Sequence, residues 1–85
     1  MKVEFKKTFL KDIKRLTDKR LQNAVAKAIL QVETAETLAQ VKGLKKLSGY
    51  EKHFRIRIGV GLKVEDQVVY FVVLEHRKDI YKGFP

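Results

Sequence analysis

The chain has 85 residues, of which 45% are hydrophobic, and this suits one small globular domain rather than a disordered segment. It contains no cysteine, which excludes a disulfide framework and a thiolate metal site. Lysine and arginine outnumber the acidic residues 19 to 10, giving a net charge of +9. Such an excess favours nucleic acid or an acidic protein partner, although a merely well-charged soluble surface is the alternative.

The start of the chain carries charges where a signal peptide has its apolar core. No apolar run approaches the length needed to span a membrane. We therefore expect a cytoplasmic protein that does not associate with a membrane.

A strand and two helices are predicted in the N-terminal half. Residues 2–6 alternate polar and apolar side chains, which is the period of a half-buried strand. Thr8 is a possible helix cap, and the apolar face of the helix after it holds Phe9, Ile13 and Leu16. A second cap at Thr17-Asp18 precedes another apolar stripe, formed by Leu21, Val25, Ala28, Ile29 and Val32. The short connection predicts an antiparallel helical hairpin packed on a sheet.

The C-terminal half is expected to form an antiparallel meander after a connector. A short extra turn near Leu38 leads into the glycine-punctuated connector, residues 42–50. Residues 53–58 read as a strand, 59–61 as a tight turn, 62–64 as the second strand and 65–67 as another turn. The continuously apolar run from Val68 to Leu74 predicts a central strand buried on both faces. The first strand can join one edge of this sheet, which gives an α+β fold.

Two arginines of the first meander strand are candidates for binding phosphate. Arg55 and Arg57 point away from Phe54, Ile56 and Ile58 in the alternation expected of a strand. Residues two apart on one strand face are separated by about 6.6 Å, close to the spacing of successive phosphates in a single strand. Guanidinium groups suit phosphate oxygens, but an ordinary amphipathic strand also carries charge on its outer face.

The segment after the central strand is a candidate for acid–base chemistry. His76 titrates near neutrality, Arg77 supplies fixed positive charge, and Tyr81 can donate a proton or stack on a base. Such groups can help a 2′-hydroxyl attack the neighbouring phosphorus of RNA. The alternative is a histidine at a strand end and a tyrosine ring packed on the core. We expect no metal, because the chain shows no obvious carboxylate cluster.

Three stretches resemble the RelE/ParE superfamily of type II toxins, closer to its RelE side: Phe5–Ile13 (FKKTFLKDI), Leu47–Gly59 with its LSGY and FRIRIG segments, and His76–Tyr81 (HRKDIY). The resemblance implies one RelE-like toxin domain over residues 1–85. It has an N-terminal strand, an antiparallel helical hairpin and a C-terminal antiparallel meander, with one sheet packed on helices. It also implies a metal-independent endoribonuclease, without cofactor, that cleaves mRNA in the ribosomal A site.

The resemblance also implies partners and residue roles. A RelB-like antitoxin is expected to neutralise the toxin, and the pair together is expected to bind operator DNA. By position, the resemblance implies that proton transfer and charge stabilisation are performed by four residues: His76, Arg77, Tyr81 and Arg57. RNA binding is carried over to a set of basic residues: Lys52, Arg55, Arg57, Lys78 and Lys82.

The turn after Gly59 departs from the family pattern. Relatives usually continue with a Gly-Asp-Tyr-Arg-like turn whose arginine contributes to catalysis, whereas Val60-Gly61-Leu62 follows here, as if about three residues were absent. We infer from this departure an attenuated or inactive toxin that keeps the fold. The alternative functions are a ParE-like gyrase inhibitor and a non-catalytic module that binds antitoxin or nucleic acid.

Overall fold

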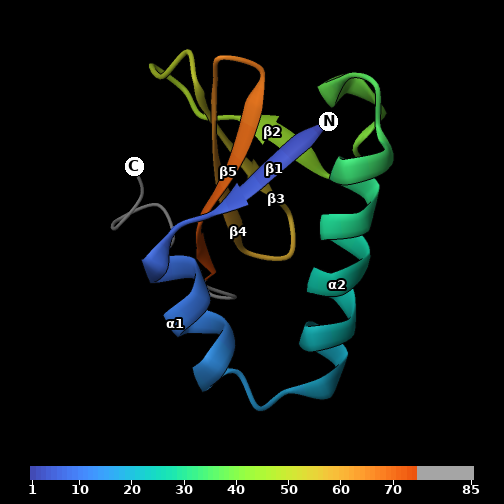
Figure 1. Ribbon diagram of the computed structural model, residues 1–85, viewed down its shortest axis with the longest axis vertical. Coiled ribbons are helices and arrows are strands. Elements are labelled where there is room, and N and C mark those ends of the chain that lie inside the picture. The colour runs from blue at the N-terminus through green and yellow to red at the C-terminus, as the bar shows by residue number, and fades with distance from the viewer. Residues whose placement is uncertain (75–85) are drawn as a thin grey trace.

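The computed structural model describes residues 1–74, which form two α-helices and five strands (Figure 1). The elements follow in the order β1 (Lys2–Phe5), α1 (Lys7–Arg15), α2 (Lys19–Thr34), a 3-10 turn (Leu38–Gln40), β2 (Leu44–Lys46), β3 (His53–Ile56), β4 (Val60–Glu65) and β5 (Val68–Leu74). The predicted α+β class, the first strand, both helices and the short extra turn are thereby confirmed.

All five strands belong to one sheet with the order β1-β5-β4-β3-β2. Strands β3, β4 and β5 form the predicted antiparallel meander, and β1 adds to its edge by pairing in parallel with β5. Strand β2 lies in the stretch expected to be only a connector. It pairs Leu44 with Ile56 and Lys46 with Phe54, after a turn in which Gly43 has a φ of 75°. Three residues are too few to show strand periodicity in the sequence.

The two helices supply apolar side chains to one face of the sheet. The ring of Phe9 in α1 lies 5.8 Å from Phe5 and 5.3 Å from Phe71, measured between centroids. From α2, Val25, Ala28 and Val32 enter the same buried cluster. Figure 1 shows the chain running down α1 and back up α2, with the helices apart from each other. The predicted antiparallel hairpin therefore exists, and its helices are held by the sheet.

Of the two predicted helix caps, Asp18 is confirmed and Thr8 is wrong. Asp18 is the predicted cap of α2, and its Oδ1 accepts hydrogen bonds from the amides of Arg20 and Leu21. Thr8 does not cap α1, because this helix begins at Lys7 and its N-cap residue is Lys6. The Thr8 hydroxyl instead donates to the carbonyl oxygen of Val72 in β5. A threonine expected to begin a helix thus ties that helix to the sheet.

The turn between β3 and β4 comes two residues earlier than predicted. It consists of Arg57, Ile58 and Gly59, and the amide of Gly59 donates to the carbonyl of Ile56 at 2.9 Å. Gly59 has a φ of 103°, a conformation that glycine adopts without steric cost. Val60, expected in the turn, is fully buried in β4. Burial of its apolar side chain outweighs the turn signal given by the glycine pair 59 and 61.

Strand β5, predicted to be central, is an interior strand between β1 and β4, and only one of its faces is fully buried. Val69 and Phe71 are inaccessible to solvent, whereas Val68 and Tyr70 are half-buried. The expectation of burial on both faces is wrong because the described helices contribute their core residues to the Phe71 side. The predicted turn before β5 is confirmed at Asp66 and Gln67, which both have positive φ.

Removing the Phe9 ring should destabilise the fold far more than removing its exposed neighbour. We expect Phe9→Ala to lower the free energy of unfolding by about 3–5 kcal/mol, because it leaves a cavity beside two other rings. Leu10→Ala is the matched control, since 48% of Leu10 is exposed. Urea denaturation followed by circular dichroism measures both variants, and equal losses would contradict this account of the core.

Candidate nucleic-acid interface

The sheet has an apolar face and a polar face, and the polar face is the candidate interface. Cross-strand pairing aligns Phe5, Phe71, Leu62 and Phe54 in one row on the helix side. The next row along the strands contains Glu4, Tyr70, Lys63 and His53. Because successive residues of a strand point to opposite faces, this second row lies on the face away from the helices.

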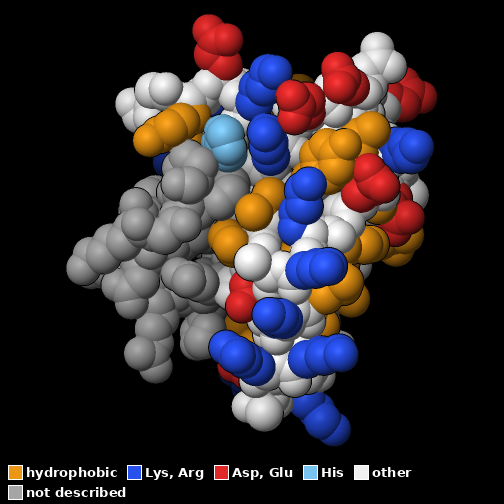
Figure 2. Space-filling model, turned by 60° about the vertical axis from the view of Figure 1, so that its left-hand side comes forward, with side chains coloured by type: hydrophobic (Ala, Val, Ile, Leu, Met, Phe, Trp, Pro, Cys, Tyr) orange, Lys and Arg blue, Asp and Glu red, His pale blue; other side chains and the backbone are white. Residues whose placement is uncertain are grey.

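Basic side chains gather on and around this polar face. Lys6 places its Nζ 4.6 Å from the centre of the Tyr70 ring, and Arg55 lies in register with Lys45. Figure 2 shows Lys and Arg side chains running from the sheet down toward the end of the molecule where α1 lies. Helix α1 itself contributes four basic residues: Lys7, Lys11, Lys14 and Arg15. Basic side chains thus lie both on the polar sheet face and on α1, with acidic side chains such as Glu4 among them, and they suit a phosphate backbone.

The two predicted phosphate-binding arginines do not share a strand. Arg55 lies in β3 and is half-buried, whereas Arg57 is the exposed first residue of the turn. The expected spacing along one strand face is therefore wrong, because β3 ends at Ile56. The backbone amide of Arg57 nevertheless donates to the carbonyl of Gly43 at 3.0 Å, which holds the turn beside the end of β2. Both residues remain near each other at one end of β3.

Five predicted site residues lie outside the described residues: His76, Arg77, Lys78, Tyr81 and Lys82. The structure does show how the strand leading to them is fixed. The amide of Leu74, the last residue of β5, donates to Oδ2 of Asp12 in α1 at 3.0 Å. The Thr8 hydroxyl holds Val72 two residues earlier. Helix α1 therefore holds the end of β5 in place through two side chains, Thr8 and Asp12.

The sequence prediction missed a cluster around Tyr50, at the upper edge of the polar face. An open pocket of about 400 Å³ is lined by seven residues: Gly49, Tyr50, Glu51, Lys52, His53, Lys63 and Glu65. We call it the Tyr50 pocket. The ring of Tyr50 contacts the His53 ring edge-on, with centroids 5.6 Å apart and planes at 77°. The Glu65 carboxylate lies 3.3 Å from Lys63 and 3.6 Å from Lys52, so the predicted RNA-binding Lys52 already has an ionic partner.

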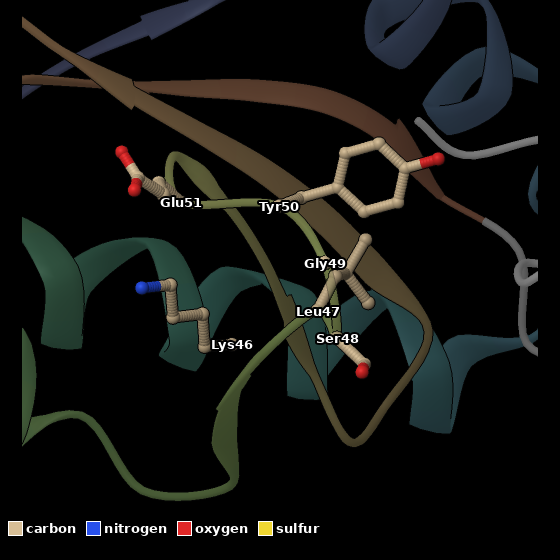
Figure 3. A pocket seen from close by; sticks show the side chains of 6 residues that line it. All are labelled: Lys46, Leu47, Ser48, Gly49, Tyr50 and Glu51. Carbon is tan, nitrogen blue, oxygen red and sulfur yellow. The ribbon is translucent and has the colours of Figure 1, made fainter.

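Figure 3 shows the loop that supplies Tyr50, seen at the neighbouring hollow lined by residues 46–51. The side chain of Tyr50 extends to the opposite side of the loop from Lys46 and Glu51 (Figure 3). The end of this loop is brought beside Lys63 by the pairing of His53 with Lys63 and by the amide of Val64, which donates to the carbonyl of Lys52 at 2.8 Å. The sequence feature that could have indicated this pocket is His53, a histidine at the start of an amphipathic strand.

Two titratable groups of the pocket, His53 and Glu65, have lowered pKa values. Partial burial and the nearby Lys63 ammonium lower the pKa of His53 from 6.5, which favours the neutral imidazole. The hydrogen bond and the positive charge of Lys63, followed by the charge of Lys52, lower the pKa of Glu65 and keep its carboxylate ionised. At neutral pH the pocket thus contains a neutral histidine and a carboxylate between two ammonium groups.

Among residues 1–74, no group of three or more His, Cys, Asp or Glu side chains is arranged to hold a metal ion. None of the helices in that range is long and apolar enough to cross a membrane.

The lowered pKa of His53 gives a pH prediction with a definite sign. As the pH falls below 6.5, the unfolded chain takes up a proton at this residue before the folded chain does. The contribution of His53 to stability is therefore complete above pH 6.5 and declines as the pH falls toward its folded-state pKa. We expect NMR titration of the His53 ring to give a pKa below 6.5, and Lys63→Gln to raise it. An unchanged pKa in the variant would exclude Lys63 as a cause.

Comparison with known proteins agrees with this architecture. No protein-family model matches the chain. It is 35% identical to Toxin RelE3 of Methanocaldococcus jannaschii in an alignment of 89 positions that covers the whole of both chains. It is also similar to a chain in the crystal structure of the RelB-RelE antitoxin-toxin complex from Methanococcus jannaschii, with a TM-score of 0.78 and 32% identity. That match covers 95% of this chain and 98% of the other. The resemblance noted in the sequence is thereby confirmed, and the chain belongs to the RelE family of toxins.

Proposed function

We propose that this chain is the toxin of a type II toxin–antitoxin system and cleaves mRNA in the ribosomal A site. The observation that carries the proposal is similarity to a RelE toxin over the full chain, together with a basic sheet face opposite the helices. A ribosomal target places its action in the cytoplasm. The basic surface supports binding to RNA through the phosphate backbone, which every mRNA shares.

The proposed reaction needs only side chains and the RNA itself. The 2′-oxygen attacks the neighbouring phosphorus and gives up its proton to a base, a bond between O2′ and phosphorus forms, and the bond to O5′ breaks. The leaving oxygen takes a proton from an acid. We assign proton transfer to His76 or Tyr81 and stabilisation of the phosphorane charge to Arg57 and Arg77. This endoribonuclease is proposed to need no metal ion or other cofactor.

Backbone binding is assigned to a further set of basic residues: Lys52, Arg55, Lys78 and Lys82. Arg57, on the exposed turn, is assigned to both roles. Because Arg55 and Arg57 occupy a strand and a turn, they are proposed to contact the RNA from different directions rather than as two equal steps along one strand.

The short β3–β4 turn supports reduced activity. Ile56 pairs directly with Val60, so only Arg57, Ile58 and Gly59 separate the two strands. A turn of this length leaves no position for the additional arginine that relatives usually carry after the glycine. We therefore propose an attenuated endoribonuclease. The same observation favours a second candidate function, a non-catalytic module that binds antitoxin or nucleic acid.

The proposed partner is a RelB-like antitoxin. The structurally similar chain comes from a complex described as RelB-RelE antitoxin-toxin. A basic face that acts on RNA is neutralised most directly by an acidic or amphipathic segment laid over it. Operator DNA is proposed to bind only to the complex of toxin and antitoxin, because free toxin is directed to the ribosome and mRNA.

Primer extension on an mRNA under translation in a purified system tests the proposed activity. We expect cuts at ribosome-positioned codons in the presence of this protein, and none on the same mRNA without ribosomes. His76→Ala or Tyr81→Phe should remove the cuts, because each variant loses a group for proton transfer.

Leu10→Ala serves as the matched variant that leaves cutting unchanged, since Leu10 is an exposed residue of α1. Absence of cuts from the folded wild-type protein, with ribosome binding retained, would contradict endonuclease activity and favour the non-catalytic module. Double-strand DNA breaks after expression would instead indicate a gyrase inhibitor.

A further inference from the structure

The Tyr50 pocket has the composition of a site for an uncharged aromatic ligand. Its charged residues balance, with Lys52 and Lys63 against Glu51 and Glu65. Its histidine favours the neutral form, because partial burial and Lys63 both oppose protonation. A phosphate would find no net positive charge in this pocket, in contrast to the surrounding basic surface. Apart from Lys52, which is paired with Glu65, the pocket therefore differs in chemistry from the residues that we assign to the RNA backbone.

An aromatic platform forms one wall of the pocket. The Tyr50 side chain comes from an exposed loop, and 48% of the residue is accessible to solvent. The ring planes of Tyr50 and His53 lie at 77° to each other, so the two rings meet edge to face and are not stacked in parallel. Nucleobases stack on such rings, and each stacked base contributes about 1–3 kcal/mol to binding.

The Glu65 carboxylate, at the end of β4, also lines the pocket and supplies a hydrogen-bond acceptor. An ionised carboxylate offers about four lone-pair positions, and the contacts with Lys52 and Lys63 use only part of them. A carboxylate accepts hydrogen bonds well from the exocyclic amino group of a base.

We propose that the Tyr50 pocket binds one unpaired nucleobase that bears an amino group, stacked on Tyr50 and hydrogen-bonded to Glu65, with Lys63 donating to a ring nitrogen or carbonyl oxygen of the base. The identification of the ligand as a base of RNA rests on the proposed function. The pocket adjoins β3, which carries Arg55 in the predicted backbone-binding set. It thus reads a base while the basic surface binds phosphates, which is the usual division between specificity and affinity in nucleic-acid recognition.

Nucleotide titration of the full chain, followed by the backbone amide signals of Tyr50, His53 and Lys63 in NMR spectra, tests the proposal. Adenosine, cytidine and guanosine monophosphates should shift these three signals in a saturable way. Uridine monophosphate lacks the amino group and should bind about threefold to tenfold more weakly, as expected for one lost hydrogen bond. Ribose 5-phosphate, which has no base, should leave the three signals unchanged.

Three variants assign the contacts. Tyr50→Ala should weaken binding of adenosine monophosphate about tenfold, whereas Tyr50→Phe keeps the stacking surface and should bind like the wild type. Glu65→Ala should remove the preference over uridine monophosphate. Dispersed amide spectra of each variant show that the protein is folded, as expected for a loop residue and an exposed carboxylate.

Two results would overturn the pocket assignment. One is a response to ribose 5-phosphate as strong as that to adenosine monophosphate, which would indicate a phosphate site. The other is the absence of shifts at Tyr50, His53 and Lys63 with every nucleotide. Neither result depends on mRNA cleavage. Cutting of translated mRNA without nucleotide binding here would refute the pocket alone, and binding without cutting would refute the proposed endonuclease alone.

Discussion

Strand β5 is the element on which the rest of the structure depends. It pairs in parallel with β1 and in antiparallel orientation with β4, so it joins the N-terminal strand to the meander. Helix α1 is bound to the same strand by the Thr8 hydroxyl and the Asp12 carboxylate. Phe71 at its centre contacts the rings of Phe5 and Phe9. Any change that shifts β5 therefore moves the neighbouring strands and the first helix together.

The arrangement of the helices on one side of the sheet explains why the other side is available for function. Core residues from α1 and α2 pack with Phe71 and Leu62, and the alternation of side chains then leaves Tyr70 and Lys63 on the opposite face. This face combines half-buried polar side chains with the basic surface around it. A single constraint, burial of one sheet face, thus separates the residues needed for folding from those proposed to meet RNA.

Elements specified by local patterns could be predicted from the sequence. The cap at Asp18 needs only its own carboxylate and the next three residues, and the apolar stripe of α2 has an unbroken helical period. The predicted position of the β3–β4 turn is wrong because Gly59 and Gly61 both favour a turn locally. The turn ends at Gly59 because Val60 is buried in the core, and this burial depends on tertiary packing. Strand β2 was missed because it is defined by its pairing with β3 rather than by its own three residues.

The candidate site shows the same division between local and tertiary information. The sequence predicts Arg55, Arg57 and Lys52 as RNA-binding residues. It also predicts Arg57 in the same strand as Arg55, whereas β3 ends at Ile56 and Arg57 lies in the turn. The cluster of Tyr50 and His53 with Lys63 and Glu65 was not predicted. These residues come from a loop and two strands, and only the register of β3 against β4 brings them together.

Lysine footprinting on the ribosome tests most directly the claim that the helix-free face meets RNA. Acylation of the protein is compared by mass spectrometry in the presence and absence of ribosomes loaded with mRNA. The account predicts protection of Lys6, Lys52 and Lys63 on and beside the polar sheet face, with Lys27 of α2 equally reactive in both states. Protection of Lys27 with Lys6, Lys52 and Lys63 still reactive would place the interface on the helices and contradict the account.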